Sequence, residues 1–364
     1  MKKNRVLPSL PVFELDLMRV LSILGVVIIH TVYPVYSRPD FLGGVAWWLA
    51  NVTNACARVG VPLFIMMSGY LLIPKQESAT KVWWRLRSRL LIPLFAWFAI
   101  FVWWDGWWLS KLRTPFEVLQ MVASGGMYHL YFLVILVGLY ALIPVIRMVQ
   151  ASTSPKQFWV GTRWLMWLGV FLYLVQYLVL PSYSMFNFGT FWLPYLGYFL
   201  LGAQLRKPRV GTRELWWGYA AGLTLTVVLG YLNVWLRTID VHVFWLGSGV
   251  SYFDEYLSMN VVLMSTCLFQ LLVHASVRSY LRWAGERVRV IVHELAGTAF
   301  GVYLVHFLVI NVYDFRFRYA IEFLNQNILV YLVKRTVLVV VTSFAMGLVL
   351  PRIPLVRRLV GMTK

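Results

Sequence analysis

Two polar side chains in the first long apolar segment of the chain have the types and spacing to do chemistry. Arg19 and His30 stand eleven residues apart in this segment. Eleven residues make about three turns of an α-helix, so both side chains project from nearly the same face, roughly 16 Å apart along the axis. A cation at the middle of a membrane helix costs about 2.5 to 3.5 kcal/mol, so it needs a partner or a function. The spacing predicts one helix face that carries a fixed cation and a titratable imidazole at two depths.

The chemistry of each side chain follows from its protonation. An imidazole, with an ordinary pKa of about 6.5, can take a proton near neutral pH, so His30 could act as a general base that deprotonates a hydroxyl. Arg19 stays protonated and suits a phosphate, a carboxylate, or an ion pair with Asp16 or Glu14. The alternative for both is separate solvation, with the arginine at the inner membrane interface and the histidine at the outer one.

Further polar residues lie inside other apolar segments. Arg58 needs an anion, which either the protein or a substrate could supply. Ser68 either shapes a substrate channel or only allows close packing, with its hydroxyl bonded to its own helix backbone. An acyl-serine intermediate is disfavoured, because nothing in the sequence places a base beside Ser68. We expect Arg58, Phe64, Ser68 and His306 to line the cavity that contains His30, although His306 could also be a hydrogen-bonded packing residue.

Three polar residues near the predicted ends of spans receive no chemical role. His129 begins a span and is interpreted as an anchor at the membrane interface. Lys334 and Arg335 start the last span, and their long side chains can extend to the membrane surface. Neither group is expected to contribute to the site.

Several motifs taken together resemble the acyltransferase-3 family of integral membrane acyltransferases, which mostly O-acetylate cell-surface carbohydrates. In chain order, the motifs are Leu15-Asp16 with Arg19 and His30, Pro62-Leu63-Phe64 with Ser68-Gly69-Tyr70, His129-Leu130-Tyr131-Phe132, Tyr195-Leu196-Gly197-Tyr198, and Phe300-Gly301-Val302-Tyr303 with His306. The resemblance covers nearly the whole chain, with Tyr131 where the family often has Trp. It implies a single membrane acyltransferase domain over residues 1–364, without the extracellular esterase-like domain of some members.

This resemblance implies a membrane O-acyltransferase. An acyl group, expected to be acetyl, would move from acyl-coenzyme A to a hydroxyl of a cell-surface glycan or a lipid-linked sugar. His30 matches the proposed catalytic base of the family, and Arg19 a residue on the donor side. Acyl-coenzyme A is then a substrate, and no bound cofactor is expected. The basic and aromatic segment 81–89 either contacts anionic lipid headgroups or also attracts the phosphates of coenzyme A.

A second hypothesis from another class is an exporter or transporter of a lipid-linked or polymeric glycan. Arg19 and His30 would then lie on a substrate path. Transporters of that kind are often built from internal repeats, and no repeat stands out in this sequence. The acyltransferase is therefore the preferred hypothesis.

Composition independently predicts a membrane protein. Apolar residues make up 60% of the chain and charged residues 13%, against roughly 25% charged in a soluble domain. The expected fold is an all-α polytopic bundle of about ten transmembrane helices, and the resemblance to the acyltransferase-3 family implies the inner membrane of a bacterium. The ten predicted spans are 12–35, 43–73, 91–109, 129–147, 164–181, 192–205, 214–236, 256–275, 294–313 and 327–350. The second span is long enough for a tilted or a broken helix, and Gly60 with Pro62 is the expected position of a break. The sixth span is short, and Pro194 with Gly197 and Gly202 could instead mark a discontinuous helix that lines a cavity.

The distribution of charge predicts the orientation. Of the 33 Lys and Arg residues, 23 fall in the tails and loops of one side and six in those of the other. The positive-inside rule then places both termini in the cytoplasm. The same asymmetry accounts for most of the net charge of +19, so no nucleic-acid partner is expected, whereas membrane lipids are. Two cysteines and six scattered histidines predict no metal site.

Overall fold

The computed structural model describes residues 12–108, 113–124, 128–178, 187–206, 209–238, 252–274, 285–316 and 327–360. Every regular element in these ranges is helical. The α-helices are α1 (Val12–Tyr36), α2 (Val45–Ala57), α3 (Gly60–Leu72), α4 (Ala79–Leu86), α5 (Ile92–Trp108), α6 (Pro115–Ser124), α7 (Tyr131–Ala141), α8 (Ile143–Ser152), α9 (Pro155–Leu178), α10 (Leu196–Gln204), α11 (Thr212–Thr238), α12 (Met259–Val273), α14 (Glu286–Asn311), α15 (Ile328–Val349) and α16 (Pro354–Leu359).

The described residues include eight helices that are long and apolar enough to cross a membrane. A ninth span results if the pair α7 and α8, bent by 42°, counts as one. This confirms the predicted all-α membrane fold. The predicted span 192–205 is different, because it is a short 3₁₀ turn (Leu193–Tyr195) followed by the nine-residue helix α10. Nine helical residues extend only about 14 Å, less than half the thickness of a bilayer core.

The predicted break in the second span is present. Helix α2 ends at Ala57 and α3 begins at Gly60, with Arg58 in the turn between them. Helix α1 crosses this break at close range. A Cβ atom on Gly25 would lie 2.7 Å from the carbonyl oxygen of Ala57, and one on Gly60 would lie 2.7 Å from the carbonyl oxygen of Ser22. Only two glycines let the backbones approach so closely, and we call this contact the Gly25–Gly60 crossing.

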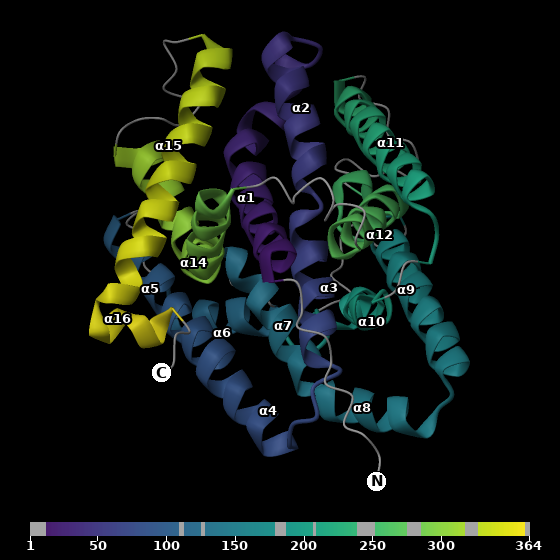
Figure 1. The fold of residues 1–364 in the computed structure, drawn as a ribbon. Helices are drawn as coiled ribbons and strands as arrows, with labels where there is room; N and C mark the ends of the chain where they lie inside the picture. The colour runs from purple at the N-terminus through teal and green to yellow at the C-terminus, as the bar shows by residue number, and fades with distance from the viewer. Residues whose placement is uncertain are drawn as a thin grey trace.

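Helix α1 is central to the bundle, because it packs against α2, α3, α14 and α15. One end of the bundle gathers the start of α1 with α4, α8 and α16 (Figure 1). We call this the basic end, because the cations of the pocket described below lie there. At the opposite end, the last turns of α1 pack with α2, α11 and the start of α15 around the buried Trp47. The cytoplasmic location of both termini stays a prediction.

Candidate functional site

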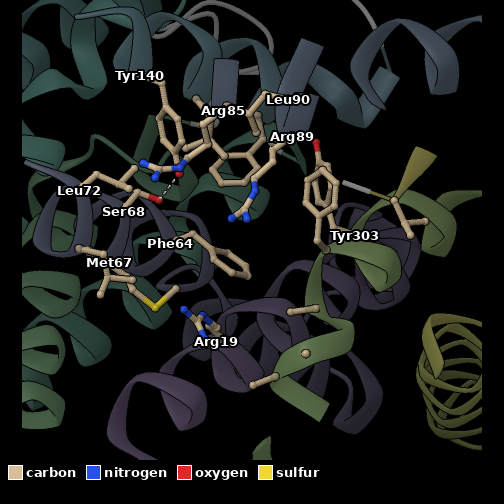
Figure 2. Close-up of a pocket in the computed structure, with 18 of the residues that line it drawn as sticks. Arg19, Phe64, Met67, Ser68, Leu72, Arg85, Arg89, Leu90, Tyr140 and Tyr303 are labelled. Atoms are coloured by element: carbon tan, nitrogen blue, oxygen red, sulfur yellow. Dashed lines mark hydrogen bonds between the residues drawn. The ribbon is translucent and has the colours of Figure 1, made fainter. Parts of the chain in front are cut away.

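A cavity of about 600 Å³ lies at the basic end of the bundle. Among the described residues, four cationic side chains line it, those of Arg19, Lys75, Arg85 and Arg89, and none of the described lining residues carries a carboxylate. The rest of the wall is mostly apolar, and Figure 2 shows Phe64 between Arg19 on one side and Arg85 and Arg89 on the other. The volume is typical of small-molecule sites, which span about 300 to 1,000 Å³. Cations beside apolar walls suit a polyanionic ligand with an uncharged arm, and we call this cavity the basic pocket.

Arg19 combines the two roles that the sequence left open. Its guanidinium donates a hydrogen bond of 2.9 Å to Asp16, and its side chain is still 37% exposed toward the basic pocket. The second carboxylate oxygen of Asp16 lies 2.7 Å from Nδ1 of His293 on α14. The ion pair with Asp16 therefore orients Arg19 at the pocket, and the contact between Asp16 and His293 joins α1 to α14.

Arg85 is held by a carboxylate just before α4. Its guanidinium makes two hydrogen bonds to Glu77, of 2.7 and 2.8 Å. The hydrogen bonds from Arg85 lower the pKa of Glu77 to about 2, so this carboxylate is charged at neutral pH. One turn further on, Arg89 also lines the pocket, whereas Arg87 does not. The basic segment 81–89 thus contributes cations to a cavity in addition to exposing tryptophans beside it.

Ser68 lines the basic pocket without a histidine partner among the described residues. Its hydroxyl accepts a hydrogen bond of 3.4 Å from the Tyr140 hydroxyl on α7. The next residue, Gly69, contacts α10 and not the pocket. A Cβ atom on Gly69 would overlap the backbone of Phe199 on α10. In this Ser68-Gly69 pair, the glycine allows α3 and α10 to pack closely, and the serine lines the pocket.

Three histidines from distant parts of the chain, His30, His129 and His306, lie together next to the basic pocket, beside its lining residue Tyr303. The ring centroids of His30 and His306 are 5.3 Å apart, and those of His129 and His306 are 4.7 Å apart. His306 is fully buried and His129 is 4% exposed. The interpretation of His129 as an interfacial anchor is therefore wrong, because the 3₁₀ turn Tyr128–Leu130 places its ring inside the bundle. Among the described residues, no group of three or more His, Cys, Asp or Glu has the geometry to hold a metal ion.

The hydrogen bonds of the histidines define which nitrogens are available. Nδ1 of His306 lies 2.7 Å from the carbonyl oxygen of Tyr303, which can only accept, so Nδ1 carries a proton. Nε2 of a neutral His306 is then an acceptor, and it is buried without a hydrogen-bond partner. Both ring nitrogens of His129 are also buried and unpartnered. Unpartnered buried polar atoms of this kind require an explanation, and a bound substrate or water is the simplest.

An aromatic wall separates the basic pocket from the histidines. Tyr303 lines the pocket, and its ring centroid is 5.4 Å from that of His129 and 6.0 Å from that of His306. Its hydroxyl donates a hydrogen bond of 2.7 Å to the backbone carbonyl of His129. Phe132 continues the wall, 5.5 Å from Tyr303 between ring centroids. The predicted single cavity is thus divided, with Arg19, Phe64 and Ser68 at the pocket and His30 and His306 behind this wall.

The turn that carries His30 is held by an unexpected residue. Pro34 has no N–H to offer the carbonyl of His30, which therefore loses its helical hydrogen bond. Arg335 of α15 reaches this point, 2.8 Å from the carbonyl oxygen of Thr31 and 3.5 Å from that of His30. The same guanidinium makes two hydrogen bonds to Asp314. Arg335 is 2% exposed, so the prediction that it extends to the membrane surface is wrong.

Arg58 lies outside the basic pocket. It is 8% exposed, and it stands in the turn between α2 and α3, at the Gly25–Gly60 crossing. Its guanidinium carbon is 5.9 Å from the ring centroid of Tyr256. Arg58 and His30 both lie on the side of the Gly25–Gly60 crossing that faces the opposite end of the bundle. Arg19 lies on the side that faces the basic end.

The fold, the basic pocket and the cluster of His30, His129 and His306 together define a polytopic helical membrane protein with a polycationic pocket beside buried imidazoles. A family model described as an acyltransferase domain matches residues 12–349. The chain therefore belongs to the acyltransferase-3 family, and it is a membrane acyltransferase. A search of curated proteins and a search of solved structures gave no match.

Proposed function

We propose that this protein is an O-acyltransferase of the bacterial inner membrane. Acyl-coenzyme A, with acetyl as the expected acyl group, binds in the basic pocket, and the acceptor is a hydroxyl of a cell-surface glycan or a lipid-linked sugar. The observation that carries the proposal is the basic pocket itself. Its four cations suit the phosphates of coenzyme A, and its apolar wall suits the uncharged arm that bears the thioester.

His30 acts as the general base in this proposal. The acceptor oxygen attacks the thioester carbonyl carbon while His30 takes the hydroxyl proton, which makes the oxygen a better nucleophile. The carbon–sulfur bond then breaks, the acyl group stays on the acceptor oxygen, and the coenzyme A sulfur leaves and takes up a proton. His306, with an acceptor Nε2 beside His30, can stabilise the protonated base. Arg19 binds the donor on the other side of Tyr303.

The donor arm has to pass the aromatic wall to reach the base. Tyr303 and Phe132 both line the pocket and form this wall, so a rotation of these rings would open a route for the thioester. The base would then meet the acyl carbon behind the wall, where water is scarce and hydrolysis is suppressed.

The deciding experiment measures thioester cleavage by purified protein in lipid nanodiscs. Acetyl-coenzyme A should release free thiol in step with the appearance of acylated acceptor, tested against a panel of membrane glycans and lipid-linked sugars. The His30→Gln protein, at equal amounts, should release little thiol. If the wild type leaves the thioester intact but moves a labelled glycan across a vesicle membrane, the protein is an exporter.

A further inference from the structure

A second polar cluster lies beyond the Gly25–Gly60 crossing, outside the basic pocket. Its centre is Asp254, in the 3₁₀ turn Tyr252–Asp254 that precedes α12. Asp254 is 3% exposed. Its Oδ2 accepts a hydrogen bond of 2.5 Å from the Tyr36 hydroxyl on α1 and one of 3.3 Å from Asn233 on α11. Two helices, α1 and α11, therefore hold this carboxylate in one orientation.

Two polar atoms in this cluster have no partner. Oδ1 of Asp254 and Nε of Arg58 are both buried, and neither makes a hydrogen bond. Among the described residues, Arg58 makes no ion pair or side-chain hydrogen bond, although its charge and that of Asp254 attract each other. A buried cation and a buried carboxylate left apart lose much of the energy that contact would give. A ligand group that accepts a hydrogen bond from Nε of Arg58 and donates one to Oδ1 of Asp254 would give both atoms a partner. An alcohol hydroxyl can do both.

The surroundings of this pair match a neutral sugar. The ring of Tyr256 faces Arg58, and Glu255 accepts a hydrogen bond of 2.7 Å from the Tyr177 hydroxyl. Aromatic rings pack on the apolar faces of sugars, while carboxylates and hydroxyls bind their hydroxyl groups. Among the residues that the structure describes around Arg58, two carboxyl groups stand against this one guanidinium, so their charge disfavours an anion. The basic pocket differs, because its described lining residues include four cations and no carboxylate.

The position of the cluster suits an acceptor. Tyr36, which donates a hydrogen bond to Asp254, lies six residues after His30 on α1, so the cluster begins about 9 Å along the helix axis from the base. The basic pocket reaches the same base from the basic end, past Tyr303. A hydroxyl at the cluster would therefore approach the thioester from the face opposite to the donor.

We propose, on the basis of the function proposed above, that Arg58 and Asp254 form the acceptor site and bind a neutral polyhydroxylated residue, a sugar, through a hydroxyl that bridges them. Glu255 and Tyr256 contact the remainder of that residue. Charged parts of the acceptor, such as a phosphate, lie outside this cluster.

The kinetic test compares Asp254→Asn with Asp40→Asn. Both changes replace a carboxylate by an amide on the same half of the protein, but Asp40 is exposed. Asp254→Asn should raise the KM for the acceptor by at least about tenfold, because a hydrogen bond to a charged group is lost. It should leave the KM for acyl-coenzyme A and the acceptor-independent hydrolysis of acyl-coenzyme A within about twofold. Asp40→Asn should change none of these quantities.

A binding test needs no catalysis and uses two small sugars. Protein in phosphatidylcholine nanodiscs is mixed with methyl glucoside or with methyl glucuronide, which differ in a hydroxymethyl and a carboxylate, and contact is measured by saturation-transfer NMR. The glucoside should give the stronger signal, and Asp254→Asn should reduce that signal by at least about fivefold. Arg58→Lys keeps the charge but loses the planar fork, and it should weaken the signal too while preserving the fold.

The two proposals fail differently in these experiments. The acceptor site is wrong if the glucuronide gives the stronger signal, if neither sugar makes contact, or if Asp254→Asn and Arg58→Lys bind the glucoside like wild type. In those cases cleavage of acyl-coenzyme A can still proceed, and the proposed function stands. If the sugar binds as expected but thioester cleavage is absent, the enzymatic proposal fails while a sugar-binding site remains.

Discussion

Arg335 donates a hydrogen bond of 2.8 Å to the carbonyl of Thr31, the residue that follows His30. The same guanidinium lies 3.5 Å from the carbonyl oxygen of His30, which lacks its helical donor because Pro34 has no N–H. Asp314 fixes the guanidinium from the other side through two hydrogen bonds. The turn of α1 that carries the proposed base is thus held by α15 and by the residues after α14.

Replacing Arg335 by Gln should slow acyl transfer through the position of His30. We expect kcat to fall by about tenfold, with the KM for acyl-coenzyme A unchanged, because the basic pocket is distant from this contact. Lys334→Gln is the matched control, since Lys334 is the adjacent residue and is exposed. Steady-state kinetics at equal amounts of folded protein measure the difference. A loss of yield with normal kcat per folded molecule would assign Arg335 to stability alone.

Removal of the imidazole at position 30 should abolish most of the activity without harming insertion. Loss of a polar ring from the membrane interior removes a cost, so His30→Ala and His30→Gln should reach normal levels. Acyl transfer should fall by at least about 100-fold, the lower range of what a positioned base supplies. The rate of the wild type should also rise with pH along a limb that the Gln protein lacks. Near-normal transfer by the Gln protein would exclude His30 as the base.

The cations that follow α4 should determine donor affinity. Arg89 lines the basic pocket and Arg87 does not, so the two arginines form a matched pair. Arg89→Gln should raise the KM for acyl-coenzyme A by about tenfold, as expected for a lost charge-assisted hydrogen bond to phosphate, whereas Arg87→Gln should not. The wild-type KM should increase with salt, because exposed charges are screened. Equal effects of the two substitutions would indicate a general attraction to the membrane or donor and not a pocket contact.

Arg19 should act on donor binding in a manner that depends on its planar shape. Arg19→Ala should raise the KM for acyl-coenzyme A, and Arg19→Lys should restore it only in part, since an ammonium cannot contact Asp16 and a phosphate through one rigid fork. Isothermal titration of coenzyme A gives the affinity without turnover. Unchanged affinity in the Ala protein would leave the ion pair with Asp16 as the whole role of Arg19.

The ion pair of Glu77 and Arg85 predicts a pH dependence of stability. The pKa of Glu77 is lowered to about 2 in the folded protein, against about 4.5 for an ordinary glutamate. A lowered carboxyl pKa stabilises the fold at pH values above the ordinary pKa, and the contribution is lost as pH falls toward the lowered one. Glu77→Gln should therefore lower the melting temperature at pH 7, and its difference from wild type should shrink between about pH 4.5 and 2. A difference that is the same at every pH would contradict this assignment.

Local patterns in the sequence were enough for the membrane class, the broken second span and the shared face of Arg19 and His30. Each of these depends on residues close together in the chain, where helical periodicity and the cost of charge in a membrane act directly. The motifs around Phe64 and Ser68 likewise predicted pocket residues, because one helix turn places them on one face. The sixth predicted span is wrong for a related reason, since hydropathy cannot distinguish a short buried helix from one that crosses a bilayer.

Tertiary structure alone decided which distant residues meet. His129 joins His306 because the 3₁₀ turn Tyr128–Leu130 packs against α14, and no spacing in the sequence links two positions so far apart. Arg335 is buried beside the His30 carbonyl, which a proline in a distant part of the chain leaves without its helical donor. Composition determined that these polar groups would be costly in a membrane, but the partner of each depends on helix packing. Packing is a property of the whole bundle, so the site could be completed only in three dimensions.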